Sequence, residues 1–250
     1  MSTLLEQAID AHGGIDNWNR FRTVTAALDI GGAVWHLKDQ PGLFHGIELA
    51  ADLRRQRVEI ASRAGGWRGT FEPDVVAIDA ANGAAPEERR TPRSAYQGHT
   101  QQTRWDRLHA LYFTGYALWT YLAIPFLYAR PGFRTEELPD WHENGETWRR
   151  LKVTFPDTIT SHSREQVSYF GEDGLLRRHD YTVDVMGGAR GANYASDYRN
   201  VHGVMVPMSR RVFAYDDATQ KIDEPLLVSI DIRSIDFHTE PAPGDRPALP

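Results

Sequence analysis

A run of 22 residues in the middle of the chain, 108–129, contains no Asp, Glu, Lys or Arg: LHALYFTGYALWTYLAIPFLYA. Its length would suit a bilayer. It also contains His109, several tyrosines and Pro125, and it lies in mid-chain between polar, strand-like segments. A helix that is apolar on all sides must be buried. We therefore predict an internal helix over residues 104–127 and no membrane span.

The rest of the chain is patterned mainly as β-strands. In the first of these segments the side chains expected on one face, as in a half-buried strand, are Val24, Ala26, Leu28, Ile30, Val34 and His36. Further strands are predicted before the helix at 43–50, 55–60, 66–71 and 75–79, and after it at 148–155, 162–170, 175–185, 193–198, 204–215 and 227–237. Short turns such as GEDG and NVHG separate most of them.

These elements predict a mainly β (α+β) fold built from a single antiparallel sheet. A sheet of about ten strands or more curls instead of staying flat. The helix is the only segment apolar enough to fill the concave face, and any space it leaves is a cavity. We expect a curled sheet, or unclosed β-barrel, wrapped around the helix. Residues 1–238 form one predicted domain, followed by a disordered, proline-rich tail over 239–250.

Composition narrows the possible functions. The net charge of −6 disfavours a nucleic-acid partner, because such proteins need a basic face. The chain has no cysteine, which excludes disulfides, thiolate metal sites and a thiol nucleophile. The N-terminus lacks the pattern of a secretory signal and predicts a helix capped by Thr3 and Glu6, so we expect a cytoplasmic protein. We expect neither a bound metal nor a cofactor, and the oligomeric state stays open.

The hairpin predicted over 162–185, HSREQVSYFGEDGLLRRHDYTVDV, is unusually rich in His and Arg. If the hairpin turn has three residues and a bulge, Arg178 and Asp180 lie on the same face of the hairpin as His162. These residue types can hold an anionic oxygen while a histidine moves a proton. The other interpretation is a solvated strand face. A turn of two or four residues would instead gather on one face His162, Arg164, Gln166, Arg177, His179 and Tyr181, with His179 opposite Gln166.

The start of the helix supplies a second candidate site. Asp106 precedes His109 by three residues, so the carboxylate can orient the imidazole for acid–base chemistry. The same pair would suit a metal with a third ligand from His162 or His179. The structural alternative is a capped helix start with an aromatic core stripe. We expect His99, in the loop before the helix, to lie near the opening of the cavity between the helix and the sheet. The stripe at helical spacing comprises Trp105, His109, Tyr112, Tyr116 and Trp119.

One segment resembles a known family. The sequence YASDYRNVHGVMVPMSRRVF, residues 194–213, is similar to the strand–turn–strand pattern of the lipoprotein-carrier (LolA/LolB-like) superfamily. The resemblance covers mainly residues 145–237 and implies an unclosed β-barrel, plugged by helices, that takes a hydrophobic ligand. Residues 98–119 and the 162–181 hairpin also resemble uncharacterised bacterial proteins of similar length, which we expect to be cytoplasmic. We expect the chain to differ from the carriers, because its N-terminal residues show no export-signal pattern.

Our leading hypothesis is binding of a small to medium hydrophobic, lipid-like ligand with a polar head in the half-barrel. The alternative is a cofactor-free or metal-assisted lyase, hydrolase or cyclase, with His109 as the base, oriented by Asp106. A third hypothesis is an interaction protein that uses the apolar helix as a docking surface. Besides His109 and Asp106, the candidate catalytic residues are His162 and His179; the candidate ligand-binding residues are Arg164, Tyr181, Gln166, Arg177, His99, Trp105, Tyr112, Tyr116 and Trp119.

Overall fold

A computed structural model of the chain describes residues 2–80 and 85–240. The helices are α1 Leu4–Ala11, α2 Ile15–Trp18, α3 Ala33–Leu37 and α4 Arg107–Ala123, with 3-10 turns η1 Pro92–Tyr96, η2 Phe126–Ala129 and η3 Asp184–Met186. The strands are β1 Thr23–Gly31, β2 Ile47–Asp52, β3 Arg57–Ser62, β4 Trp67–Glu72, β5 Val75–Ala80, β6 Glu87–Arg90, β7 Arg134–Glu143, β8 Glu146–Thr154, β9 Glu165–Phe170, β10 Leu176–Val183, β11 Ala189–Val201, β12 Val204–Tyr215, β13 Lys221–Ile222 and β14 Val228–His238.

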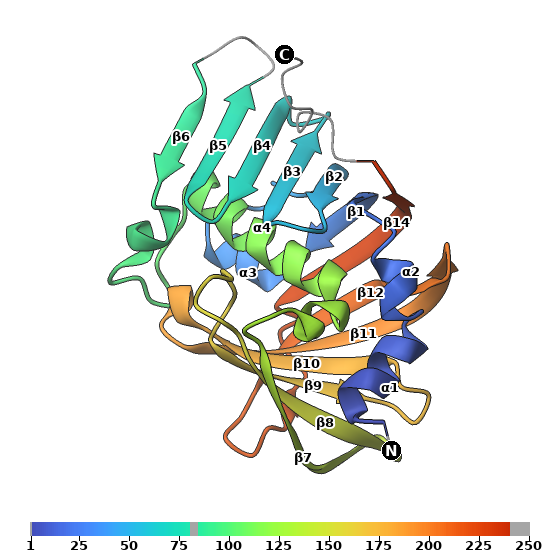
Figure 1. The fold of residues 1–250 in the computed structure, drawn as a ribbon. Coiled ribbons are helices and arrows are strands. Elements are labelled where there is room, and N and C mark those ends of the chain that lie inside the picture. The colour runs from blue at the N-terminus through green and yellow to red at the C-terminus, as the bar shows by residue number, and fades with distance from the viewer. Residues whose placement is uncertain (1, 81–84, 241–250) are drawn as a thin grey trace.

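The described strands form one antiparallel, 14-stranded sheet in the order β6-β5-β4-β3-β2-β1-β14-β12-β11-β10-β9-β8-β7, with β13 paired to β12. Strands β6 and β7 are the two free edges, so the sheet does not close. Figure 1 shows the sheet bending around α4, with β2–β6 on one side of the helix and β8–β12 on the other. This is the predicted curled sheet around an apolar helix.

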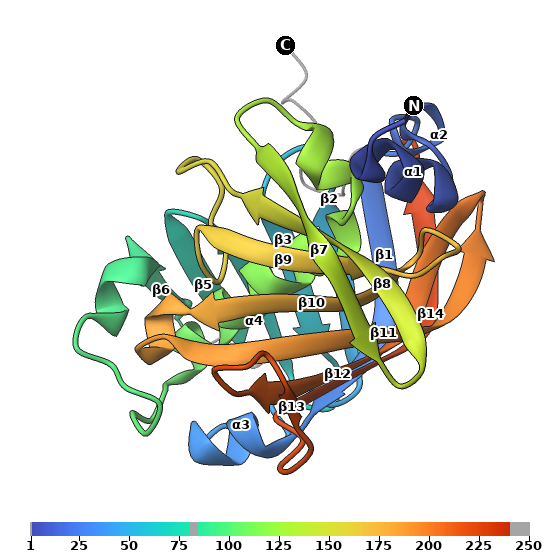
Figure 2. The same ribbon diagram turned by 90° about the horizontal axis from the view of Figure 1, so that it is seen from below.

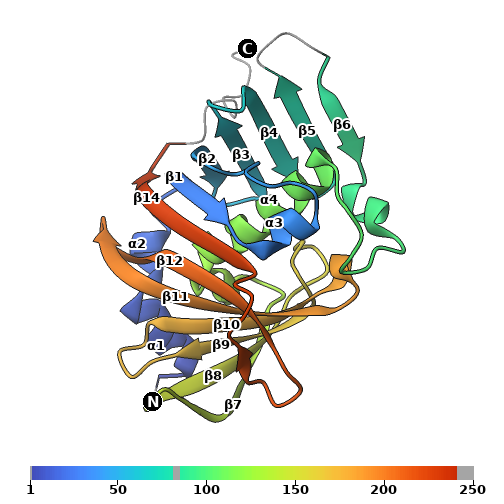
Figure 3. The same ribbon diagram turned by 180° about the vertical axis from the view of Figure 1, so that it is seen from behind.

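The outer features are clearer in the other views. Seen from below, β7 and β8 cross in front of β9 to β11, and the short β13 lies outside the main sheet (Figure 2). Seen from behind, α3 lies beside the end of β14 (Figure 3). The inner face of the curled sheet is covered by α4 and, beyond the end of α4, by η2, whose Tyr128 contacts Ser168 of β9.

The first strand is shorter than its sequence pattern predicts. Its residues alternate between buried and half-buried positions from Val24 to Gly31, which explains why the segment pairs as a strand. Gly32 then has a φ of 108° and lies against the Leu227 carbonyl, where a side chain would clash. The chain turns there into α3. The prediction that Val34 and His36 continue the strand is wrong for that reason.

Three strands are absent from the sequence prediction: β6, β7 and β13. β6 reads EERR and β7 reads RTEELPDWHE, and most of their side chains are exposed. An edge strand that buries few side chains needs no apolar alternation, so the hydrophobic pattern does not reveal it.

Helix α4 confirms the predicted internal helix but is shorter than 104–127. It begins after the N-cap residue Asp106 and ends at Ile124, directly before Pro125, which cannot continue a helix. Almost every residue from Leu108 to Ala123 is buried. Among the described residues, no helix combines the length and apolar character needed to cross a membrane. The predicted tail, 239–250, lies outside the described residues from position 241.

Candidate functional site

The polar side chains of the β9–β10 hairpin divide between the two faces of the sheet. Tyr181 pairs with Gln166 and His179 with Ser168, and the register shifts at Arg177. Residues directly opposite each other in a ladder share a face. The predicted grouping of Gln166, His179 and Tyr181 is therefore observed, with the pairing displaced by two residues. These side chains meet polar groups of α4, η2 and neighbouring strands in what we call the inner polar cluster: Tyr121, Tyr128, His162, Gln166, Ser168, His179, Tyr181, Asn193 and Arg210.

One chain of hydrogen bonds in the cluster runs through His179. Tyr128 Oη lies 2.7 Å from Ser168 Oγ, which lies 3.0 Å from His179 Nδ1. His179 Nε2 lies 2.6 Å from Gln166 Oε1, and the Gln166 amide donates to the Ser163 carbonyl at 2.9 Å. Because the amide oxygen can only accept, His179 carries its proton on Nε2 and accepts at Nδ1. Both ring nitrogens are thus engaged in a neutral network.

A second chain links α4 to His162, which lies just before β9. His162 Nε2 is 2.8 Å from Tyr121 Oη, which donates to Tyr181 Oη at 2.6 Å. The His162 ring stacks on Tyr181 with centroids 3.9 Å apart. Gly191 makes room for this stack, because a Cβ there would lie 2.6 Å from the Tyr181 ring. Within the described residues, His162 Nδ1 has no hydrogen-bond partner.

Burial controls the ionisation of the cluster. Desolvation lowers the pKa of His179 to about 3, with help from the charge of Arg210, and it lowers the pKa of His162 well below its ordinary value. Desolvation also raises the pKa of Tyr121 to about 12 and that of Tyr181 well above its ordinary value. At neutral pH these four side chains carry no charge.

Arg210 is the cation of the cluster. Its side chain is buried, its Nη2 donates to the Tyr121 carbonyl at 3.0 Å, and its guanidinium lies 5.1 Å from the Tyr121 ring centroid. Its Nη1 has no partner, and no carboxylate forms an ion pair with it, in the described part of the chain. Asn193 is also fully buried, and neither polar atom of its side chain makes a hydrogen bond to a described residue. The amide nevertheless lies near enough to Tyr121 to offset part of the rise in its pKa.

Two predicted pocket arginines are not in the cluster. Arg164 forms an ion pair with Asp157 at the surface, in a hollow of about 220 Å³ outside the sheet. Arg177 pairs with Asp173 at 2.7 Å and is partly exposed. Arg177 occupies the register shift that precedes Arg178, so its side chain leaves the alternation of the strand. The prediction that Arg164 and Arg177 share the inner face is therefore wrong.

The alternative placement of Arg178 and Asp180 on the inner face is also wrong. Arg178 is fully buried on the other face, where it bonds Asp180 at 2.7 and 2.8 Å and Glu143 at 2.9 Å. Tyr194 and the Thr219 carbonyl accept its remaining hydrogen bonds at 3.2 and 2.8 Å. Through these bonds Arg178 joins β7, β10 and the β12–β13 connection.

Asp106 and His109 meet as the sequence predicts, at the first turn of α4. His109 Nδ1 lies 2.7 Å from Asp106 Oδ1, and the Asp106 carboxylate accepts from the His109 backbone N–H at 2.9 Å. Burial opposes ionisation of Asp106, yet hydrogen bonds from Arg89 and from the His109 N–H hold its pKa at about 2. His109 Nε2 lies 3.3 Å from the Ala95 carbonyl. The contacts are those of a capping box.

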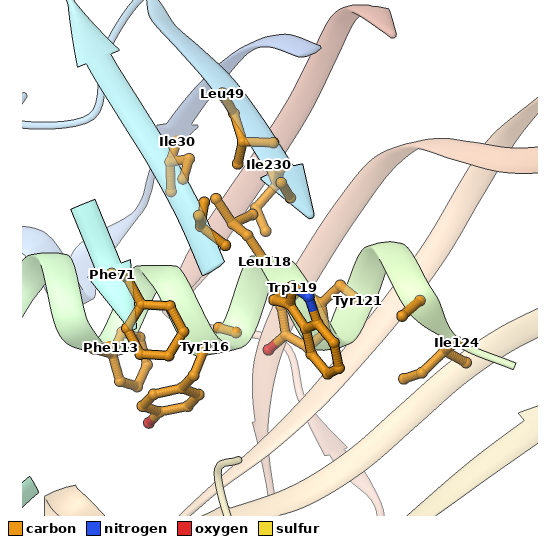
Figure 4. Packing of buried hydrophobic residues seen from close by; sticks show 14 of the residues in the cluster. Ile30, Leu49, Phe71, Phe113, Tyr116, Leu118, Trp119, Tyr121, Ile124 and Ile230 are labelled. Carbon is orange, nitrogen blue, oxygen red and sulfur yellow. The ribbon is translucent and has the colours of Figure 1, made fainter. Parts of the chain in front are cut away.

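The aromatic stripe is divided among different neighbours. Trp105 packs on Tyr96 and Phe113, and His99 lies against His109 with ring centroids 5.0 Å apart. Tyr112 packs on Phe71, and the Trp119 indole donates to the Asp52 carbonyl at 2.7 Å. Only Tyr116 reaches the inner polar cluster, through the His162 ring at 5.0 Å. Figure 4 shows Tyr116 on the opposite side of α4 from Leu118, which points towards Ile30, Leu49 and Ile230.

The histidines therefore do not converge on one site. His99 and His109 lie at the start of α4, whereas His162 and His179 lie in the inner polar cluster near its end. No group of three or more His, Asp or Glu side chains among the described residues is arranged to hold a metal ion.

The interior space is small. A cavity of about 30 Å³ adjoins the cluster, lined by Tyr121 and Tyr181 and by apolar side chains that include Ala117, Val212 and Ile230. That volume holds about one water molecule. A larger hollow of about 800 Å³ lies at the surface by the ends of β1 and β14 and shares no residue with the cluster. In this conformation α4 fills the concave face almost completely.

Tyr121, Tyr128, Asn193 and Arg210 belong to the cluster but are missing from the sequence-based candidates. A signal for Arg210 is present in β12, because a residue that alternates with Val206, Met208 and Val212 must share their buried face. The two tyrosines look like ordinary residues of an apolar segment until the sheet is placed around them.

No protein-family profile matches this sequence, and no curated protein is similar to it. Solved structures do resemble it. A LolA superfamily protein from Nitrosomonas europaea superposes with a TM-score of 0.51 at 10% identity, covering 95% of this chain and 93% of its own. A DUF1329 family protein from Desulfovibrio piger superposes with a TM-score of 0.53 at 11% identity, and the match covers 94% of each chain. An outer membrane lipoprotein-sorting protein domain from Vibrio parahaemolyticus superposes with a TM-score of 0.50 at 10% identity, and the match covers 91% of this chain and 93% of that domain.

The chain has a LolA-like fold. At these identities the comparison concerns the backbone architecture alone, and it agrees with the unclosed sheet and enclosed helix described above. The LolA-like fold places the inner polar cluster on the concave face, between the sheet and α4.

Proposed function

We propose that the protein binds an apolar, lipid-like small molecule with a polar head, between α4 and the concave face of its LolA-like sheet. The observation that carries the proposal is a set of buried side-chain polar atoms in that interface that make no hydrogen bond to a described residue. Nearly all buried polar groups in native proteins are hydrogen-bonded. Among the described residues, the unpartnered atoms of this interface include Thr114 Oγ1, Tyr116 Oη and Thr120 Oγ1 of α4, and His162 Nδ1, both side-chain polar atoms of Asn193, and Arg210 Nη1. Three more unpartnered atoms, His99 Nδ1, Trp105 Nε1 and Tyr112 Oη, lie nearer the start of α4.

These groups make the closed interface less stable than its apolar packing would allow. Leaving a buried donor or acceptor unsatisfied costs about 1–3 kcal/mol. A ligand whose polar head bonds such groups recovers part of that free energy. The apolar part of the ligand can replace α4 against the sheet, so that the concave face stays covered.

The small cavity implies that α4 moves when a ligand enters. A volume of about 30 Å³ is far below the roughly 300–1,000 Å³ of typical small-molecule sites. Three hydrogen bonds join the end of α4 to the sheet: Trp119 donates to the Asp52 carbonyl, Tyr121 donates to Tyr181 Oη, and Arg210 donates to the Tyr121 carbonyl. We infer that the structure is the closed, ligand-free state of a binding protein.

The catalytic alternative has less support from the geometry. It depends on His109, and the contacts of His109 with Asp106 and with the Ala95 carbonyl are those of a helix cap. The docking-surface hypothesis also loses its basis, because α4 is buried. The cytoplasmic location expected from the sequence stays a prediction, which cell fractionation would test.

Binding can be measured by titrating the purified protein with dodecanoate and with dodecan-1-ol, following tryptophan fluorescence. Trp35 lines the cavity and is expected to report occupancy. We expect saturable binding of one dodecyl chain. Ala117→Leu should weaken binding about tenfold or more, because the added carbons fill the cavity beside α4.

Ala218→Leu is the matched control, because it makes the same substitution at an exposed position outside the cavity and should not weaken binding. Circular dichroism would verify that both variants are folded, and native mass spectrometry would give the stoichiometry. Absence of saturable binding to the wild-type protein, or unchanged affinity in the Ala117→Leu variant, would overturn the proposal.

A further inference from the structure

Two arginines are buried in the described part of the chain, and their surroundings differ. Arg178, on the outer face of the sheet, bonds Asp180 and Glu143 and is compensated by their carboxylates. Arg210, on the inner face, has no carboxylate partner in the described residues and makes one hydrogen bond, to the Tyr121 carbonyl. The other guanidinium group on the same strand is paired too, since Arg211 bonds Asp231 at 2.7 Å.

An unpaired buried cation is costly, since the charge has lost its water and gained no counter-ion. Arginine does not escape this cost by releasing its proton, because its pKa is too high. The nearby ring of Tyr121 and the dipole of one carbonyl compensate only part of the charge. The closed structure therefore holds a cation for which it supplies no anion.

The surroundings of Arg210 show where an anion would bind. In the sheet register Arg210 pairs with Ala195 and Ile230, and Asn193 is the diagonal neighbour on the next strand, two residues before Ala195. Diagonal neighbours on one face are within reach of long side chains. The free Nη1 of Arg210 and the free Nδ2 of Asn193 are both hydrogen-bond donors.

The apolar wall begins immediately beside these donors. Ile230, the cross-strand partner of Arg210, and Val212, two residues further along β12, both line the interior cavity. A ligand with its head at Arg210 would therefore place its chain directly in the space between the sheet and α4.

We propose that the polar head of the ligand is a carboxylate, bound by the guanidinium of Arg210 with the Asn193 amide as a second donor. This inference rests on the proposed function and specifies its ligand class. A planar carboxylate matches the fork of a guanidinium. His162 and His179 are neutral, as are the tyrosines, so the site offers one positive charge. One charge suits a monoanion better than a dianionic phosphate.

The test compares dodecanoate with dodecan-1-ol at pH 8, using the full chain and its variants. The wild-type protein should bind dodecanoate at least about tenfold more tightly than the alcohol, as expected for one charge-assisted hydrogen bond. Arg210→Met should lose this preference while keeping its affinity for the alcohol. Arg211→Met, in which the neighbouring surface ion pair is lost, should behave as the wild type does.

Arg210→Met is expected to fold, because it removes an unpaired buried charge. Asn193→Leu provides a second variant of similar size that removes the amide donor without changing the charge, and it should reduce the preference severalfold. Equal binding of both probes by the wild type, or a preference that survives in Arg210→Met and Asn193→Leu, would overturn the carboxylate assignment alone. Failure of the wild type to bind either probe would overturn the proposed function with it.

Discussion

At the scale of single residues, burial changes the chemistry of several histidines that look alike in the sequence. His12 directly precedes a Gly-Gly turn, yet only 2% of it is exposed. Its Nδ1 bonds the Ala8 carbonyl at 2.7 Å, and its ring packs edge-on against Phe126 and Phe170. Desolvation lowers the pKa of His12 to about 4. Together with His162 and His179, it is held neutral by the fold.

Because these three histidines are buried in their neutral form, we predict that the free energy of unfolding decreases in mild acid. The unfolded chain takes up protons on them below its ordinary histidine pKa of about 6.5, whereas the folded chain resists protonation down to about 4 for His12 and about 3 for His179. Their contribution is fully present above pH ~6.5 and is lost as the pH falls towards the folded values. For each histidine, the free energy of unfolding changes by at most about 1.4 kcal/mol per pH unit.

Urea unfolding at pH 7, 6 and 5 would measure this slope. His12→Asn keeps a side chain able to bond the Ala8 carbonyl but removes one titrating group, so the slope should decrease by about one proton. The exposed, non-titrating Gln102 supplies the control, since Gln102→Asn should leave the slope unchanged. A free energy of unfolding that does not change between pH 7 and pH 5 would contradict the prediction.

At the scale of elements, α4 combines two kinds of stabilisation. Its sides are buried against both halves of the sheet, and its first turn is capped by Asp106. Arg89 reinforces the cap with two hydrogen bonds to the same carboxylate, at 2.6 and 3.2 Å. Because His109 fills the third position of the capping box, the pair that suggests catalysis in the sequence has a structural role in the helix start.

Replacing Asp106 with Ala should therefore lower the free energy of unfolding by about 1–2 kcal/mol, since the His109 backbone N–H loses its acceptor. Asp106→Asn keeps a capping oxygen and should retain most of the stability. Thermal or urea unfolding of the three proteins would measure the difference. An equally large loss in both variants would show that the ion pair with Arg89, rather than the cap, stabilises this end of α4.

At the scale of the whole molecule, the unclosed sheet leaves two free edges. Unpaired edge strands can join other chains, and proteins protect them with charges and prolines. β6 consists of four charged residues, and β7 carries Pro139 among charged side chains. The large apolar side chains exposed among the described residues are only Leu37 and Ile222. We expect the protein to be monomeric in solution.

The double variant Glu88→Val/Arg90→Val removes the ion pair at 3.0 Å between these residues and makes the β6 edge apolar. It should associate as its concentration rises, which size-exclusion chromatography with light scattering would detect. Glu88→Gln/Arg90→Gln removes the charges but keeps a polar edge and should associate less. A wild-type protein that is already a stable dimer, unchanged by either variant, would show that the β6 edge does not control assembly.

The general fold was predictable because it depends on local patterns. An uncharged helix must be buried, and alternating segments on both sides of it must pair into a sheet large enough to curl. The edge strands β6 and β7 were not predictable in this way, because they bury little and carry no apolar alternation. Part of the site could be predicted in the same way. Gln166, His179 and Tyr181 share a face whenever the hairpin register shifts by an even number of residues, because side chains alternate between the two faces of a strand.

Local sequence patterns therefore specify a curled sheet around an internal helix, with polar residues on a strand face. Which of these polar residues lie inside depends on the tertiary structure. The register shift at Arg177 sends that side chain outwards, and a shift of one residue reverses the face of every side chain beyond it. Tyr121, on α4, and Arg210, on β12, meet only when the sheet curls around the helix. Their contact is made by packing over long sequence separations, which no local pattern contains.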